Sequence, residues 1–212
     1  MGGELFLYAI LIVTFAMVGA KRITALVNGF RLQSLALSLL TLLLAVRGRS
    51  AELYAIAALL FIIKVVLIPL FLRRVARDIR VNEDLGLFVN PAASILVALL
   101  LVWCARLFAG RISSMGGAAE GGVFTVALSL MLIGLFLMTA RMQALAQIVG
   151  LLVMENGLFL AGASVAGGMP FFVEIAIFFD VFLCVIILGV FVYRIRKVFT
   201  HIDIDKLTEL RG

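Results

Sequence analysis

Long apolar runs separated by short polar joints make up most of this chain. A membrane-spanning helix needs about 20 apolar residues at a rise of about 1.5 Å per residue. Seven runs meet this requirement, and they cover roughly residues 4–20, 26–46, 51–72, 86–108, 122–140, 144–167 and 172–193. The pattern therefore predicts an all-α integral membrane protein with about seven transmembrane helices, with six or eight as the alternatives.

The basic residues between these runs predict the orientation of the helices. Cytoplasmic loops of membrane proteins carry an excess of Lys and Arg. If the seven spans alternate sides, 13 of the 18 basic residues fall on one side, four on the other, and Lys64 within a span. This distribution predicts an N-terminus outside and a C-terminus in the cytoplasm. No basic residue precedes the first apolar run, so we expect a helix there and not a cleavable signal.

Composition agrees with a membrane protein. Apolar residues make up 65% of the chain and charged residues only 14%, against about 25% charged in soluble domains. The net charge of +6 would also fit a nucleic-acid binder, but the basic residues flank apolar runs and form no continuous stripe. Cys104 and Cys184 lie inside apolar runs and are interpreted as packing residues. No P-loop, dinucleotide-binding, CxxC or HxxxH motif occurs, so we expect no cofactor or metal in this chain.

Four ionisable side chains lie inside the predicted spans, namely Lys64, Glu155, Glu174 and Asp180. A charged residue at the bilayer centre costs about 2.5–3.5 kcal/mol on insertion scales. Such residues usually face a bundle interior or a water path, and they often carry protons or ions. We therefore interpret all four as candidates for a proton relay, with Asn156 as a supporting polar residue beside Glu155.

Three of these candidates also have a structural interpretation. Glu155 is either a proton-relay carboxyl or a neutral carboxyl that is hydrogen-bonded to a neighbouring helix. Glu174 marks either the outer mouth of a path or a carboxylate in interfacial water. Lys64 is either a titrating amine or half of a static pair with Glu155, with Asp180 or with another subunit. The residues alone leave this choice open.

Two polar segments outside the spans are predicted to face other molecules. Residues 73–80 are basic, and we interpret them as a loop anchored at anionic lipid headgroups or, alternatively, as a docking site for a soluble partner. Residues 198–212 form a polar tail that keeps apolar residues at positions 202, 204, 207 and 210. A free tail would not need these residues, so we expect it to pack on a cytoplasmic partner subunit.

Several stretches carry a family resemblance. Residues 148–156 and 202–212 resemble the K-type subunit of respiratory complex I and the C-type subunit of multisubunit sodium/proton antiporters. Taken whole, the chain resembles the hydrogenase-4 component E family. Members of this family are membrane subunits of group 4 NiFe-hydrogenase complexes such as formate hydrogenlyase. Residues 61–65, residues 152–157 and the stretch from Glu174 to Asp180 carry that similarity.

The resemblance implies a division of the chain and a function. Residues 1–115 would form a four-helix membrane extension, residues 116–197 a K-type-like unit of three helices, and residues 198–212 the tail. The chain would be a non-catalytic membrane-arm subunit in the prokaryotic inner membrane, coupling electron transfer to proton or sodium translocation. Its partners would be antiporter-like membrane subunits, the subunit that anchors the soluble arm, and cytoplasmic hydrogenase-like subunits that hold the iron–sulfur clusters and any NiFe centre.

The resemblance also bears on the proton-relay candidates. K-type subunits carry two mid-membrane glutamates, whose positions fall here on Leu152 and near Cys184. Glu155 and Asp180 each lie about one helical turn from those positions, so the carboxylates are displaced and not lost. The alternatives are a purely structural subunit that holds antiporter-like subunits together and, ranked last, a stand-alone secondary transporter. The sequence leaves open the electron donor and whether the ion is H⁺ or Na⁺.

Overall fold

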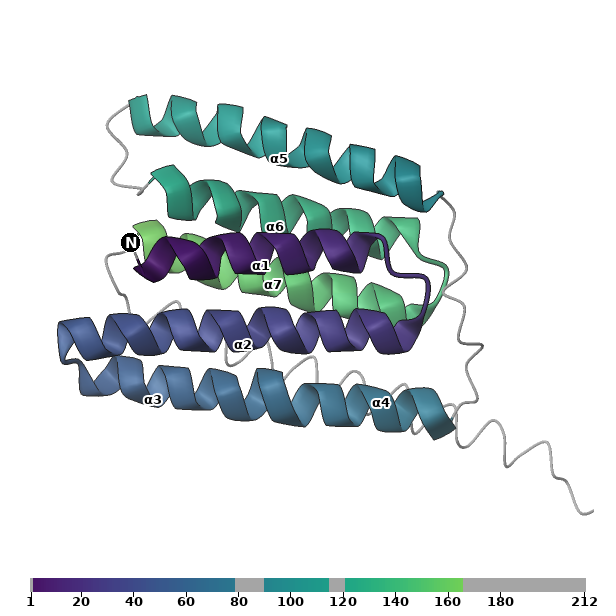
Figure 1. The fold of residues 1–212 in the computed structure, drawn as a ribbon, viewed down its shortest axis with the longest axis horizontal. Helices are drawn as coiled ribbons and strands as arrows, with labels where there is room; N and C mark the ends of the chain where they lie inside the picture. The colour runs from purple at the N-terminus through teal and green to yellow at the C-terminus, as the bar shows by residue number, and fades with distance from the viewer. Residues whose placement is uncertain (1, 79–89, 115–120, 166–212) are drawn as a thin grey trace, which may run out of the picture. The chain divides into compact units, whose positions relative to one another are not determined.

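The computed structural model describes residues 2–78, 90–114 and 121–165, and these ranges are helical apart from their short joints. They all belong to one unit, Met1–Ala176. The helices pack side by side along a common direction (Figure 1). In chain order they are α1 (Gly2–Val18), α2 (Ile23–Gly48), α3 (Ala51–Leu60), η1 (Phe61–Leu67), α4 (Ile68–Asp78), α5 (Pro91–Ser114), α6 (Gly121–Ala140) and α7 (Ala144–Val165).

These helices confirm the predicted all-α membrane class. Within the described residues, five helical stretches are long and apolar enough to cross a membrane, because α3, η1 and α4 form one continuous rod. The shorter α1 is apolar as well. The protein is therefore a multi-pass membrane protein. The predicted seventh span, residues 172–193, and the predicted tail, residues 198–212, lie outside the described residues, so the exact number of spans stays a prediction.

One predicted boundary needs correction. The fourth apolar run was expected over residues 86–108, whereas α5 begins at Pro91 and continues to Ser114. Asn90 sets this start, because its side-chain Oδ1 accepts a hydrogen bond from the N–H of Ala92 at 3.3 Å. Proline is favoured at the first position of a helix, where its missing N–H would have no intrahelical partner.

Helices α6 and α7 approach each other closely through glycines. A Cβ atom at Gly134 would lie 2.5 Å from the backbone nitrogen of Met154, and one at Gly150 would lie 2.9 Å from the carbonyl oxygen of Gly134. A Cβ atom at Gly157 would lie 2.7 Å from the carbonyl oxygen of Ala127. These glycines therefore permit backbone-to-backbone packing, which is how small residues stabilise helix pairs in membranes.

The outer surface of the helices is apolar. On α5, for example, the side chains of Leu96, Trp103 and Phe108 are all more than half exposed. Such a surface would favour aggregation in water, whereas lipid accommodates it without penalty. Cys104 belongs to this face and is exposed. The interpretation of Cys104 as a residue packed inside the chain was therefore wrong, because α5 lies at the side of the helices and turns that face outward.

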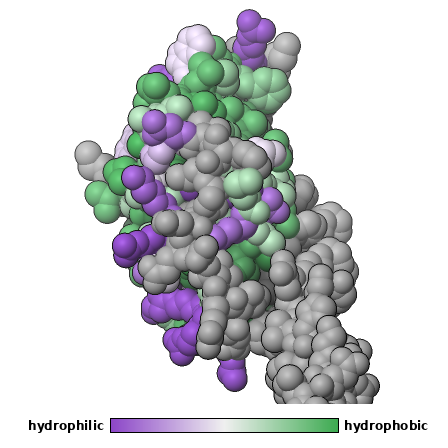
Figure 2. Space-filling model, turned by 90° about the vertical axis from the view of Figure 1, so that its right-hand side faces the viewer, coloured by the Kyte–Doolittle hydropathy of each residue, from purple (hydrophilic) through white to green (hydrophobic). Residues whose placement is uncertain are grey.

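Basic side chains gather at one end of the described helices. Figure 2 looks onto the end where α1 finishes and α2 begins, and hydrophilic residues are visible there. The exposed side chains at this end include Lys21, Arg22, Arg74 and Arg77. These residues were assigned by the sequence to one side of the membrane. Whether that side is the cytoplasm stays a prediction.

Candidate functional site

Lys64 lies on a distorted turn of helix in the middle of a membrane span. The segment η1 is a π-helix, in which the N–H of Ile68 donates to the carbonyl of Ile63, five residues back. Pro69 follows immediately and has no N–H to donate, and its ring would clash with the carbonyl four residues earlier. Widening the helix relieves this clash, and π-helical turns are frequent at functional sites. The Lys64 side chain is fully buried.

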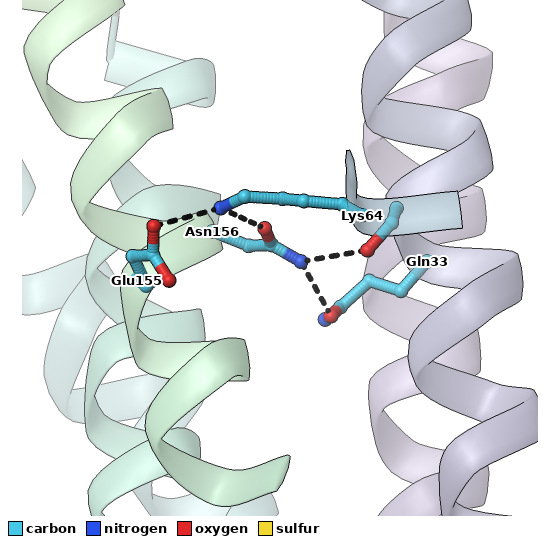
Figure 3. Close-up of polar contacts among 5 residues, drawn as sticks. Gln33, Lys64, Glu155 and Asn156 are labelled. Carbon is cyan, nitrogen blue, oxygen red and sulfur yellow. Dashed lines mark hydrogen bonds and ion pairs between the residues drawn. The ribbon is translucent and has the colours of Figure 1, made fainter. Parts of the chain in front are cut away.

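The ammonium of Lys64 forms an ion pair with Glu155 of α7. The Lys64 Nζ and Glu155 Oε1 atoms lie 3.0 Å apart, and both side chains are buried. In Figure 3 the lysine extends across the space between η1 and α7 to reach the carboxylate. Removing one partner of a buried pair typically costs about 3–5 kcal/mol, because the other charge is left without compensation. The pair therefore fixes η1 against α7 as long as both side chains are charged.

Asn156 extends this contact toward α2. Its Oδ1 accepts a hydrogen bond from Lys64 Nζ at 3.1 Å. Its Nδ2 donates to Gln33 Oε1 at 3.1 Å and to Ser34 Oγ at 3.4 Å. The labelled side chains of Lys64, Glu155, Asn156 and Gln33 converge between the helices in Figure 3. Because the amide nitrogen is held by α2, the amide oxygen is directed at the lysine.

The hydrogen bonds continue from Gln33 to α1. Gln33 Nε2 donates to Thr14 Oγ1 at 2.7 Å, and Thr14 Oγ1 donates to the carbonyl of Ile10 at 2.7 Å. In every hydrogen bond of this series, the donor therefore belongs to the residue nearer to Lys64 in the series, and the acceptor to the next one or to the carbonyl of Ile10. Gln33 and Thr14 are fully buried. We call Lys64, Glu155, Asn156, Gln33, Ser34 and Thr14 the polar chain. It links α1, α2, η1 and α7, and its titratable members are Lys64 and Glu155.

The two faces of α7 explain why this arrangement is rigid. Gly150 and Gly157 are seven residues apart and lie on nearly the same face, at about 100° per residue. Glu155 and Asn156 project well away from that face. The glycine face packs on α6, whereas Asn156 reaches α2 and Glu155 reaches Lys64. Close packing behind the polar residues leaves α7 little freedom to turn.

The structure brings together three of the residues selected from the sequence, namely Lys64, Glu155 and Asn156. Among the partners considered for Lys64, the structure shows Glu155. The other two candidates, Glu174 and Asp180, lie outside the described residues. Whether these residues relay protons stays a prediction.

Sequence reasoning missed the uncharged members of the polar chain. Gln33, Ser34 and Thr14 are polar positions inside apolar runs, and this was the only signal that they gave. An uncharged side chain in a span is tolerated far more easily than a charged one, so it attracts less notice.

A second buried charge, Arg141, lies at the joint between α6 and α7. Its Nη2 donates to the carbonyl of Val18 at 2.7 Å and its Nη1 to that of Ala20 at 2.8 Å. Val18 is the last residue of α1, so its carbonyl has no partner within the helix, and Ala20 lies two residues beyond that end. Burial lowers the pKa of the Arg141 guanidinium, but arginine stays charged at neutral pH. Arg141 therefore compensates the negative end of the α1 dipole. The sequence had indicated only a loop residue here.

No metal centre accompanies the polar chain in the described part of the protein. Residues 2–78, 90–114 and 121–165 contain no group of three or more His, Cys, Asp or Glu side chains that could hold a metal ion. The functional groups of the polar chain are a carboxylate, an amine, two amides and two hydroxyls.

Comparisons with known proteins identify relatives over most of the chain. An uncharacterized protein of Mycobacterium tuberculosis is 29% identical over 210 residues, which is 99% of this chain and 93% of that protein. Hydrogenase-4 component E of Escherichia coli is 32% identical over 152 residues, 72% of this chain and 70% of the relative. Component E of Shigella flexneri has the same values. No family profile matches the chain, and no solved structure matches it. The chain belongs to the hydrogenase-4 component E family.

Proposed function

We propose that this protein is a non-catalytic membrane subunit of an energy-converting, hydrogenase-like complex and that it takes part in the translocation of protons or sodium ions. The buried pair of Lys64 and Glu155, held by Asn156 inside the membrane-spanning helices, is the observation that carries the proposal. The sequence similarity to hydrogenase-4 component E supports the proposal that this chain belongs to a multisubunit hydrogenase-like complex.

Stability alone does not require this pair. Buried ion pairs can often be replaced by apolar residues of similar volume without loss of stability, and sometimes with a gain. Ionisable residues at membrane depth are rare and usually serve transport of protons or ions. Both side chains of this pair are buried, and an amide orients the lysine. A functional role therefore explains the pair better than a structural role.

The chemistry of the proposed step is simple. In the resting arrangement Lys64 carries the proton as an ammonium and Glu155 is a carboxylate. Transfer of one proton from Nζ to Oε1 would give a neutral amine and a neutral acid, and the net charge of the pair would not change. Release of the carboxyl proton onward, and uptake of another by the amine, would restore the ion pair. Glu174 and Asp180 would continue the route.

The remaining parts of the proposal follow from the sequence. The N-terminus would lie outside and the basic helix ends in the cytoplasm of a cell with a prokaryotic inner membrane. Residues 116–197 would act as a K-type-like unit beside antiporter-like membrane subunits and the subunit that anchors the soluble arm. The iron–sulfur clusters and any NiFe centre would be held by partner subunits, and residues 198–212 would pack against one of these.

The test uses the Glu155→Gln variant in the intact complex. A tag on this chain allows the complex to be purified in mild detergent, and mass spectrometry identifies the subunits that accompany it. In a separate sample, inverted membrane vesicles that contain the complex are used to measure proton translocation and electron transfer side by side. We expect the variant to assemble and to transfer electrons, but to lose most of the proton translocation, because an amide cannot accept and release the proton.

The matched control is Glu52→Gln, since Glu52 is an exposed glutamate in the first turn of α3. It should leave translocation unchanged. Normal translocation by the Glu155→Gln complex would refute the relay, and recovery of the tagged wild-type chain without partner subunits would refute the complex.

The direct contact between Lys64 and Glu155 favours one second function, that of a structural subunit. In that case the pair holds η1 to α7, and Glu155→Gln should cause loss of the assembled complex instead of loss of translocation in an assembled complex.

A further inference from the structure

The oxygen atoms around the Lys64 ammonium have the chemistry of a site for a monovalent cation. A carboxylate oxygen of Glu155 lies 3.0 Å from Nζ and an amide oxygen of Asn156 lies 3.1 Å from it. Carboxylate and amide oxygens are the hard ligands that alkali and alkaline-earth cations prefer. Inside a membrane span such a site would attract any small cation that could reach it.

The amide oxygen is directed at the cation position by contacts that do not involve Lys64. Asn156 Nδ2 is held by Gln33 Oε1 at 3.1 Å and by Ser34 Oγ at 3.4 Å. Gln33 is held in turn by Thr14. The carboxylate comes from the adjacent position on α7, whose glycine face is packed on α6. The amide oxygen would therefore keep its position if the ammonium were absent, and the backbone that carries the carboxylate would stay in place, so the site is partly preorganised.

The protein supplies its own cation to this site. Lys64 reaches it from η1, and its side chain is fully buried. A group tethered to the same molecule competes at an effective concentration of at least about millimolar, whatever the composition of the solution. The ammonium and a sodium ion carry the same charge, and two cations cannot share one carboxylate and one amide oxygen without strong repulsion.

We propose that Glu155 and Asn156 form a monovalent-cation site which the ammonium of Lys64 occupies, so that Lys64 excludes sodium and makes this chain selective for protons. This inference rests on the proposed role in ion translocation and names the ion. Lys64 is then the residue that determines specificity. The ammonium of Lys64 can give a proton to the carboxylate. Na⁺, in contrast, could take the position of the ammonium only if Lys64 lost its proton and stayed buried as a neutral amine.

The experiment measures binding of radioactive Na⁺ to the full-length chain, purified in detergent, with choline as the replacement cation. The measurement is made at about pH 8.5, so that protons compete little with Na⁺ for the oxygens. We expect the wild type to show no saturable binding. The Lys64→Met variant should show saturable binding of about one Na⁺ per chain, and Li⁺ should compete.

Three further variants identify the site. Lys64→Arg keeps a tethered cation and should not bind Na⁺. Adding Asn156→Leu to Lys64→Met should weaken Na⁺ binding by about tenfold or more, because an amide–cation contact is lost. Adding Glu155→Gln should abolish binding. Saturable binding by the wild type, or binding by folded Lys64→Met that does not exceed that of the wild type, would overturn the inference.

The inference stays testable if the substitution impairs folding. Lys64→Gln keeps hydrogen-bond donors toward both oxygens, and it should also bind Na⁺, although less tightly than Lys64→Met. If both variants aggregate in choline, Na⁺ or Li⁺ should restore a monodisperse, helical protein, because the ion would replace the missing charge. Failure of Na⁺ and Li⁺ to restore it would refute the inference.

The two proposals fail in different ways. Wild-type Na⁺ binding that Glu155→Gln removes, together with loss of ion translocation in the Glu155→Gln complex, would refute proton selectivity and keep the role in translocation. Normal proton translocation by the Glu155→Gln complex would refute the role in translocation, whatever the sodium measurements show.

Discussion

Lys64 and Glu155 are separated by 91 residues in the sequence, yet Nζ of the first lies 3.0 Å from Oε1 of the second. The two residues lie on either side of residue 115, where the sequence predicts the boundary between an N-terminal extension and a K-type-like unit. The pair therefore joins a residue before the predicted boundary to a residue after it. A function that depends on Glu155 would depend on both segments, which would explain why they occur in one chain.

The first prediction concerns the stability of this pair. Lys64→Met should lower the free energy of unfolding by about 3–5 kcal/mol, because Glu155 loses its compensating charge. The double variant Lys64→Met/Glu155→Leu should regain most of this loss, because two apolar side chains of similar volume fill the space. Thermal unfolding of the purified chain in detergent, followed by circular dichroism, measures both effects.

The same double variant separates the two candidate functions. If the pair is structural, the complex that carries the double variant should assemble and translocate protons normally. If the pair relays protons, the complex should assemble and fail to translocate them. A double variant as unstable as Lys64→Met would contradict the interpretation that only charge compensation is lost.

The second prediction concerns Asn156, which connects Lys64 to α2. Asn156→Leu removes a donor and an acceptor and leaves the buried Gln33 oxygen without this bond. We expect a loss of about 1–3 kcal/mol, the usual cost of an unsatisfied buried polar group. Thr139→Val is the control, because the exposed Thr139 hydroxyl bonds only to carbonyls of its own helix. Equal midpoints of thermal unfolding for the two variants would contradict a structural role for the polar chain.

The sequence predicted the membrane class and the approximate place of six apolar runs, because an uninterrupted hydrophobic stretch of this length is typical of a membrane-spanning helix. It also selected Lys64 and Glu155, because a charge in such a stretch is conspicuous. It could not choose between Glu155 and Asp180 as the partner of Lys64. That choice depends on which helices are neighbours, and the hydrophobic pattern of a single chain does not encode this.

Other features were hidden for different physical reasons. Gln33 and Thr14 are uncharged, so their presence in apolar runs gives no indication of a partner. The π-helix around Lys64 had a single signal, Pro69, which is compatible with a kink as well as with a widened turn. Arg141 was counted as a loop charge, because its burial depends on where α1 ends in space.

The third prediction concerns the packing of α6 on α7. Gly134→Ala should destabilise the protein by about 1–3 kcal/mol or more, because the added Cβ would lie 2.5 Å from a backbone nitrogen that cannot move independently. Gly110→Ala is the matched control, since a Cβ there meets nothing within 4 Å. In the middle of a helix this control should instead be neutral or stabilising by about 0.5–1 kcal/mol. Similar unfolding midpoints for both variants would contradict the close approach of the two helices.

The last prediction concerns the attachment of α1. Arg141 donates to the last carbonyl of this helix and to the carbonyl of Ala20 just beyond it, and each charge-assisted bond contributes about 1.5–3 kcal/mol. Arg141→Met should therefore loosen the end of α1 and free the backbone at Lys21 and Arg22 to enter the active site of trypsin, which should cleave there several times faster than in the wild type. Arg106→Gln, at an exposed position of α5, should leave that rate unchanged. If trypsin cleaves Arg141→Met and the wild type at the same rate, α1 is held by its apolar contacts, and the buried guanidinium must serve something other than the end of this helix.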